Sequence, residues 1–236
     1  GLDGLRERLA EYGKLGAKFA KWRAVIDISP SIPSRFAIEA NAHALARYAG
    51  LCQEAGIVPI VEPEVLMDGD HDIDRCYDVT ELTLKTLYAE LYEARVALEG
   101  SILKPNMVIA GMECPHRASV HEVARATVRC LRRHVPAAVP GIVFLSGGQT
   151  DRMATAHLNE INRPPGPKPR RISFSYGRAL QDAAMAAWQG RDENLKAGQQ
   201  AIFHRARCNG AASLGKYTEE MKAGPVKAPG SEHRRD

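Results

Sequence analysis

Residues 56–64 read Gly-Ile-Val-Pro-Ile-Val-Glu-Pro-Glu, and this stretch decides how the fold is interpreted. Apolar side chains fill the run until two carboxylates, Glu62 and Glu64, appear towards its C-terminal end. Residues two apart on a β-strand point to the same face of the sheet. The stretch therefore predicts a buried strand that presents both carboxylates from one face, close to the point where the chain leaves the sheet.

Apolar runs of the same kind recur along the chain, and amphipathic segments separate them. The other runs occupy residues 19–28, 102–108, 142–145 and 172–176. Helical patterns lie at 34–55, 72–96, 119–133 and 150–161, and a pair of helices is expected at 178–189 and 192–213. Because strand is followed by helix five times, the pattern predicts an α/β fold with a parallel sheet and helices on its faces.

Two architectures fit this alternation, an open doubly wound sheet and a closed (β/α)₈ (TIM) barrel. The polar residues of the strand runs gather at their C-terminal ends or on one parity, as barrel active sites require. No G-x-G-x-x-G follows the first run, so a dinucleotide-binding sheet is disfavoured. We therefore predict a TIM (β/α)₈ barrel of which about five of the eight strands lie in this chain.

The organisation of the chain follows from the same reading. It begins at Gly1 within helical sequence, which is typical of a fragment, so up to three barrel strands are expected to be missing. Residues 1–213 are expected to form the partial barrel. Residues 214–236 are rich in Lys, Gly, Pro, Glu and Arg and have no apolar period, so a flexible C-terminal tail is expected there.

Composition narrows the class of protein. No run approaches the roughly 20 apolar residues of a membrane helix, and no secretory signal is present, so a cytoplasmic protein is expected. The net charge of +4 is not gathered into one run, which argues against nucleic-acid binding. The five scattered cysteines indicate reduced thiols, and the eight histidines show no H-x-x-x-H spacing, so neither a metal nor another cofactor is expected.

Lys104 is the most informative single residue. It follows Ile102-Leu103 and precedes Pro105-Asn106, where an apolar strand enters its C-terminal loop. A lysine in an apolar setting tends to lose its proton, and a neutral amine is the nucleophile that Schiff-base chemistry needs. Position alone fits equally well a lysine that is paired with a carboxylate and has only a structural role.

Charged residues on two other strands bear on that choice. Lys21 and Arg23 share one face of the 19–28 strand, as Glu62 and Glu64 do on theirs. If both faces point inwards, the mouth of the barrel contains two lysines, an arginine and two glutamates. That set supplies a lysine nucleophile, a carboxyl group to move protons, and charges that tune both. A solvated surface network is the alternative, although such networks seldom lie on strands this apolar.

The last two strands predict a phosphate site. Ser146-Gly147-Gly148 places a hydroxyl group and two unobstructed backbone amides after one strand, and Ser175 to Arg178 ends the next with Gly177 and an arginine at a helix start. Backbone N–H groups, a helix N-terminus and a guanidinium together suit a phosphate dianion. Phosphate sites of (β/α)₈ enzymes often follow the last two strands.

The chain resembles a known family, the class I (Schiff-base) fructose-bisphosphate aldolases. The resemblance is carried in order, over nearly the whole chain, by five motifs: FAKWR (19–23), GIVPIVEPE (56–64), LKPNM (103–107), FLSGGQ (144–149) and FSYGRAL (174–180). It implies reversible cleavage of fructose 1,6-bisphosphate to dihydroxyacetone phosphate and glyceraldehyde 3-phosphate, in glycolysis and gluconeogenesis. It also implies a cytosolic homotetramer.

The resemblance assigns roles residue by residue. Lys104 becomes the Schiff-base lysine and Glu62 the main proton-transfer group, while Glu64 and Lys21 assist dehydration of the carbinolamine. Arg23 would bind the far phosphate of the substrate. The phosphate of dihydroxyacetone phosphate would be bound by Ser146, Gly147, Ser175, Gly177 and Arg178.

Two departures from the family leave questions open. The three family strands ahead of FAKWR, with an aspartate and a further lysine, are not in the sequence, so the chain alone is expected to be inactive or nearly so. The family's terminal tyrosine is also absent, since the last tyrosine is Tyr217.

Two alternatives therefore stay open, a non-catalytic scaffold that retains the fold and another Schiff-base aldolase acting on a different sugar phosphate. The sequence does not decide the oligomeric state or the preference between mono- and bisphosphate sugars.

Overall fold

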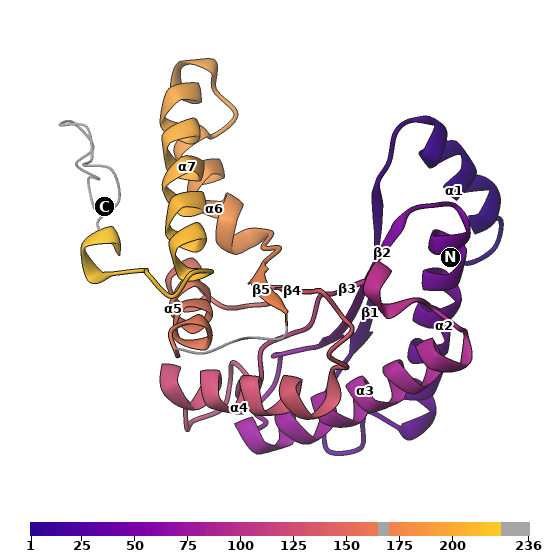
Figure 1. Ribbon diagram of the computed structural model, residues 1–236. Coiled ribbons are helices and arrows are strands. Elements are labelled where there is room, and N and C mark those ends of the chain that lie inside the picture. Colours follow the sequence, from indigo (N-terminus) through magenta and orange to yellow (C-terminus); the bar gives the residue numbers. More distant parts are fainter. Residues whose placement is uncertain (165–169, 223–236) are drawn as a thin grey trace.

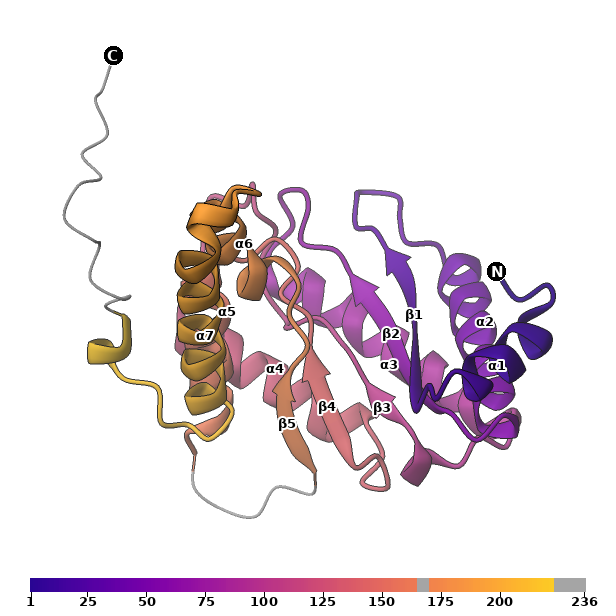
Figure 2. The same cartoon turned by 90° about the horizontal axis from the view of Figure 1, so that it is seen from above.

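The structure, a computed structural model, describes residues 1–164 and 170–222 and is built around one parallel sheet. Its five strands lie side by side in the order of the chain (Figure 2). They are β1 (Phe19–Ile26), β2 (Val58–Val65), β3 (Ile102–Leu103), β4 (Gly141–Phe144) and β5 (Arg171–Phe174). Every neighbouring pair is parallel, as the alternation of apolar runs and helical patterns predicts.

Helices connect the strands and cover one face of the sheet. The α-helices are α1 (Leu5–Lys14), α2 (Arg35–Glu54), α3 (Ile73–Glu93), α4 (Val120–His134), α5 (Asp151–Asn162), α6 (Arg178–Trp188) and α7 (Leu195–Ala212). Short 3₁₀ turns lie at Leu98–Gly100, Asp192–Asn194 and Glu219–Lys222. Figure 1 shows α2 to α5 as an arc beneath the sheet, with α1 beyond β1 and the α6–α7 pair beyond β5. In the described residues no helix lies over the opposite face.

The two faces of β1 differ because side chains alternate along a strand. Ala24 and Ile26 are buried against the helical layer, and Trp22 packs against Tyr48 of α2 with ring centroids 5.5 Å apart. The residues between them, which include Lys21 and Arg23, are exposed on the other face. The apolar parity of the strand thus fixes which face receives its charges.

The core lies between the sheet and its helical arc. It joins strand side chains such as Leu103, Ile142 and Phe144, each fully buried, to the inner faces of the helices. This burial anchors the strands from one side only, so that their C-terminal ends and the uncovered face remain available for polar residues.

Side chains cap the helices that lead away from the sheet. Ser34, Asp72, Ser119 and Thr150 each accept a hydrogen bond from a backbone N–H in the first turn of α2, α3, α4 and α5. At α4 the cap is reciprocal, because the carboxylate of Glu122 also accepts from the backbone N–H of Ser119 at 2.8 Å. This is the capping box that the spacing of Ser119 and Glu122 predicts.

Replacing Ser119 by alanine is expected to lower the free energy of unfolding by about 1 kcal/mol, because an amide at the start of α4 loses its acceptor. Urea unfolding followed by circular dichroism measures this change. Ser119→Asp retains an acceptor at the same position and serves as the control. Equal losses in both variants would contradict the capping interpretation.

Two predicted elements end three or more residues earlier in the structure. The run 102–108 forms a strand only over Ile102–Leu103, although the backbone N–H of Lys104 still donates to Val61 at 2.8 Å. The helix predicted over 72–96 ends at Glu93, because Arg95 adopts a left-handed φ of 54°. The helical sequence expected at the start of the chain forms α1.

The packed part of the chain continues past the boundary predicted at residue 213. Tyr217 is buried, and its N–H donates to the side chain of Asn159 at 2.9 Å. Residues 223–236 of the predicted tail lie outside the described residues, so the division at 213/214 remains a prediction. Among residues 1–164 and 170–222, none of the helices combines the length and apolar character that crossing a bilayer requires.

Candidate active site

Glu62 lies at the centre of the charged cluster that the structure assembles. Its carboxylate is buried and receives one lysine on each oxygen. Lys104 Nζ lies 3.0 Å from Oε1, and Lys21 Nζ lies 3.3 Å from Oε2, an ion-pair distance without hydrogen-bond geometry. A single buried carboxylate therefore faces two ammonium groups from two different strands.

The two lysines differ in exposure. The side chain of Lys104 is 13% exposed, whereas that of Lys21 is 43% exposed. Lys104 is therefore the more enclosed of the two, and Lys21 lies at the solvent side of the same carboxylate.

A second ion pair lies one step further along the same strands. Arg23 Nε donates to the buried carboxylate of Glu64, and this hydrogen bond raises the pKa of Arg23 above its ordinary value. The arginine itself is about half exposed, so its remaining N–H groups face solvent. An anion that approaches the cluster thus meets a permanently charged, forked donor.

Strand register brings these groups together. In the parallel pairing of β1 with β2, Lys21 lies opposite Ile60 and Arg23 lies opposite Glu62. Each cation therefore reaches the carboxylate two residues further along β2, on the face that both strands share. Lys104 joins them because β3 ends beside Val61, to which its own N–H donates.

The predicted phosphate residues form the other half of the site. Arg178 Nη2 donates to the carbonyl oxygen of Gly147 at 2.7 Å, which joins the start of α6 to the loop after β4. The N–H of Ser175 donates to Phe144 at 2.9 Å, and Ser146 is buried at the strand end. The loops after β4 and β5 therefore lie together, as a shared phosphate site requires.

The prediction of an unobstructed backbone amide at Gly148 is wrong. This N–H donates to the thioether sulfur of Met67 at 2.9 Å. The amide is therefore already bonded, to a weak acceptor. Gly147 adopts a left-handed φ of 58°. Among the described residues its amide has no acceptor, so it is the amide of this loop that remains available to an anion.

Comparison with known proteins gives this arrangement a family. The family model for class-I fructose-bisphosphate aldolase, a glycolytic family, matches residues 1–231. The chain belongs to the class-I fructose-bisphosphate aldolase family. The resemblance carried by the five motifs of the sequence is thereby confirmed.

Relatives in this aldolase family come from distant organisms. The chain is 62% identical over 218 residues to the probable fructose-bisphosphate aldolase class 1 of Xanthomonas campestris pv. campestris, with 92% of the chain and 65% of the relative aligned. Over 222 residues it is 56% identical to fructose-bisphosphate aldolase B of Gallus gallus, with 94% and 61% aligned. The chain thus spans less than two thirds of the length of these relatives.

A solved aldolase structure supports the fold. Fructose-bisphosphate aldolase from Plasmodium falciparum, in a ternary complex with TRAP and a small-molecule inhibitor, superposes with a TM-score of 0.90 at 49% identity. The match covers 92% of this chain and 63% of that one. The α/β architecture and the TIM-barrel assignment are therefore confirmed, with five barrel strands in the described residues.

Asn106 is a supporting residue next to the aldolase ion cluster, and the sequence does not mark it out. Its buried side chain accepts from the N–H of Val65 at 3.1 Å and donates to Thr80 and to the carbonyl of Met107 at 3.0 Å each. It thereby ties the loop after Lys104 to the end of β2 and to α3. The only sequence signal is its place in LKPNM, directly after the strand.

The buried His157 pairs with the half-buried Gln149 behind the phosphate half. His157 Nδ1 lies 2.6 Å from Gln149 Oε1, and since this oxygen only accepts, the ring donates from Nδ1. The ring nitrogen Nε2 is buried and has no hydrogen-bond partner within residues 1–164 and 170–222. Burial lowers the pKa of His157 to about 4, so the imidazole is neutral at neutral pH.

This depressed pKa predicts a pH-dependent stability. The unfolded state binds a proton near pH 6.5 and the folded state only near pH 4, so the contribution is complete above pH 6.5 and disappears as the pH falls towards 4, by about 3 kcal/mol. His157→Gln is expected to flatten the dependence of unfolding free energy on pH between 4 and 7. His116→Gln, at an exposed histidine, is the control in the same urea titrations. An unchanged slope in His157→Gln would contradict this assignment.

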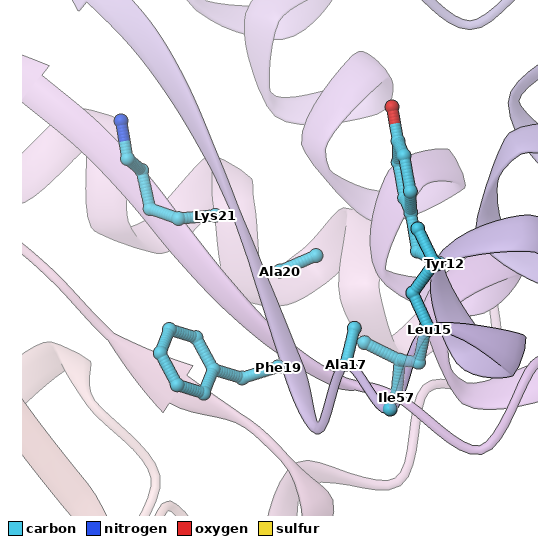
Figure 3. Close-up of a pocket in the computed structure, with 8 residues that line it drawn as sticks. Tyr12, Leu15, Ala17, Phe19, Ala20, Lys21 and Ile57 are labelled. Carbon is cyan, nitrogen blue, oxygen red and sulfur yellow. The ribbon is translucent and has the colours of Figure 1, made fainter.

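A hollow of about 580 Å³ lies beside the cluster, at the N-terminal end of β1 (Figure 3). Its lining is mostly apolar and comes from the end of α1 and the start of β1, and includes Tyr12, Leu15, Phe19 and Ile57. Lys21 is its only charged residue, and Figure 3 shows Phe19 and Lys21 pointing to the same side of β1. Because Glu62 and Lys104 do not line it, the reacting centre is assigned to the ion cluster and not to this hollow.

In the parts of the chain that the structure describes, no three His, Cys, Asp or Glu side chains group to hold a metal ion. The five cysteines are buried free thiols that lie outside the cluster.

Proposed function

We propose that this chain carries the Schiff-base centre of a class I fructose-bisphosphate aldolase, with Lys104 as the nucleophile. The reaction is the reversible cleavage of fructose 1,6-bisphosphate to dihydroxyacetone phosphate and glyceraldehyde 3-phosphate. One observation carries the proposal: the least exposed lysine of the cluster lies 3.0 Å from a buried carboxylate. A nucleophile within hydrogen-bond reach of its acid/base group is the arrangement that covalent catalysis requires.

Glu62 is assigned the proton transfers. The neutral amine of Lys104 adds to the ketone carbon, and the resulting carbinolamine loses water to give an iminium ion. Glu62, 3.0 Å from Lys104 Nζ, is placed to protonate the departing hydroxyl and then, as carboxylate, to remove the proton of the substrate hydroxyl. The C–C bond then breaks, and its electron pair moves to the iminium nitrogen.

Lys21 and Glu64 support these steps. Lys21 Nζ lies 3.3 Å from the second oxygen of Glu62, so it is placed to orient this carboxylate towards Lys104. Glu64 holds Arg23, whose outer N–H groups are assigned to the far phosphate of the substrate. The near phosphate is assigned to Ser146, Gly147, Ser175, Gly177 and Arg178, a set supported by the contact between Arg178 and Gly147.

The proposed function also includes a cellular location and an oligomeric state. A cytoplasmic homotetramer is proposed for the protein that carries this chain, as the family resemblance implies. A phosphorylated sugar is its proposed partner, with neither nucleic acid nor a membrane involved. The mild positive charge of +4 favours the approach of such an anion.

Borohydride trapping tests the proposal directly. Treatment with dihydroxyacetone phosphate and borohydride is expected to reduce the imine and leave a stable adduct on Lys104, located by peptide mass spectrometry. Omission of borohydride is the control, because the unreduced imine hydrolyses. An adduct at Lys21 instead would contradict the assignment. Activity that a chelator removes would contradict the Schiff-base mechanism, and trapping without C–C cleavage would favour the scaffold alternative.

A further inference from the structure

We propose that Met112 is a modification site at which peroxides form a sulfoxide, and that this oxidation displaces the loop of residues 146–149. The inference concerns the position and reactivity of this thioether. It rests on the proposed function only where the bound anion is taken to be phosphate.

Three thioether sulfurs support the loop after β4. The N–H of Gly148 donates to Met67 Sδ at 2.9 Å, and Gln149 Nε2 donates to Met107 Sδ at 3.7 Å. The sulfur of Met112 also lies against the loop, since a Cβ built on Gly148 would lie 2.7 Å from it. No residue other than glycine fits at Gly148 unless Met112 moves, so this sulfur is in direct contact with the loop backbone.

The three methionines are not equally accessible. Met112 is 40% exposed, whereas Met67 is 9% and Met107 1% exposed. Oxidation of methionine follows access of the oxidant to sulfur. A peroxide in solution therefore reaches the sulfur of Met112 before it reaches the other two.

The backbone at Met112 is held from several sides. Its N–H donates to the carbonyl of Met67 at 2.7 Å, and its own carbonyl accepts from the guanidinium of Arg117. Just before it, Gly111 approaches Gly69 so closely that a Cβ would lie 2.3 Å from the Gly69 carbonyl oxygen. Because the backbone of Met112 is held in place, an oxygen added to its sulfur changes the contact with Gly148, and either the loop or the thioether side chain must shift.

The chemical step is balanced. The thioether sulfur of Met112 attacks one oxygen of hydrogen peroxide, the O–O bond breaks, and sulfoxide and water form, with sulfur oxidised by two electrons. The product has a polar oxygen that accepts hydrogen bonds strongly, where a soft apolar contact existed before. That oxygen competes with Met67 for the amide of Gly148 and lies beside Gly147, whose amide is assigned to the anion. Sulfoxide reductases reverse the change, so the site is a switch.

The experiment combines three measurements on the chain. Graded hydrogen peroxide treatment is followed by peptide mass spectrometry, by hydrogen exchange of the peptide covering residues 146–150, and by calorimetric titration with inorganic phosphate. Met112→Leu keeps the volume but cannot form a sulfoxide. Met153→Leu is the matched control, since Met153 is also 40% exposed and lies on α5.

In the original chain and in Met153→Leu, Met112 is expected to be oxidised before Met67 and Met107, exchange in 146–150 to accelerate, and phosphate affinity to fall about tenfold, the loss of one hydrogen bond to a charged group. Met112→Leu is expected to show neither change after peroxide. Earlier oxidation of Met67, or unaltered exchange after complete oxidation of Met112, would overturn the inference. If the untreated chain fails to bind phosphate, the assigned phosphate site is wrong, while exchange still decides the inference.

Discussion

Lys104→Arg is expected to lower kcat/KM for fructose 1,6-bisphosphate by about 10⁴-fold or more, in the protein that carries this chain. Arginine keeps a positive charge within reach of Glu62, so the ion pair at 3.0 Å and the local fold are preserved. A guanidinium cannot lose its proton and form an imine, so only the covalent step is removed. Steady-state cleavage measured alongside borohydride trapping separates the loss of chemistry from the loss of substrate binding.

Lys21→Arg is the matched control. It makes the same substitution at the other lysine of the same carboxylate, 3.3 Å from Oε2 of Glu62. Because Lys21 is assigned a tuning role, this variant is expected to retain borohydride-trapped adduct on Lys104 and to lose far less activity. Two equal losses, or full trapping in Lys104→Arg, would contradict the division of roles.

Glu62→Gln is expected to lower kcat by about 10²- to 10⁴-fold, the range found when a positioned acid/base group is removed. Glutamine keeps the size of the side chain but can neither accept nor release a proton at working pH. It also leaves the ammonium groups of Lys104 and Lys21 without the carboxylate they share. Single-turnover cleavage, which isolates the chemical steps from product release, measures this change.

Glu64→Gln provides a close comparison. Glu64 lies on the same strand and the same face, is 5% exposed against 3% for Glu62, and pairs with Arg23 and not with Lys104. The expected effect is therefore a rise in KM for the bisphosphate that exceeds any fall in kcat. A fall in kcat as large as that of Glu62→Gln would reassign the proton transfers to Glu64.

The sequence predicted best which strand face carries each charged side chain and which strand end it lies near. The two-residue spacing of Glu62 and Glu64, and of Lys21 and Arg23, places each pair on one face whatever surrounds the strands. The position of Lys104 after a short apolar run likewise places it at a strand end. These conclusions need only the period of a strand and a parallel sheet.

The sequence could not predict which cation pairs with which carboxylate, because this depends on the register between β1 and β2. The sequence does not say that Lys21 lies opposite Ile60, and a slip of one residue would point the cations to the other face. The contacts that support the phosphate loop from behind could not be predicted either. Met67 lies 81 residues from the amide of Gly148 that it accepts from, and no local pattern announces such a contact.

Helix ends show the same limit. Glycine and proline mark many of them, but α3 stops where Arg95 takes a left-handed φ of 54°, a conformation that its residue type does not announce. Likewise, β3 is two residues long although its apolar run continues to Val108. Tertiary contacts, such as the hydrogen bonds of Asn106, decide these endings.

The strand order β1-β2-β3-β4-β5 has a consequence for how the chain acquires its structure. Each strand from β2 to β5 pairs with the strand that immediately precedes it, so within this described sheet no strand waits for a segment synthesised much later. Loop closure is then short at every step, which favours fast, stepwise assembly. During synthesis, each new unit can add to a sheet that already exists, so a ribosome-bound intermediate ending after α4 should already protect the amides of β2.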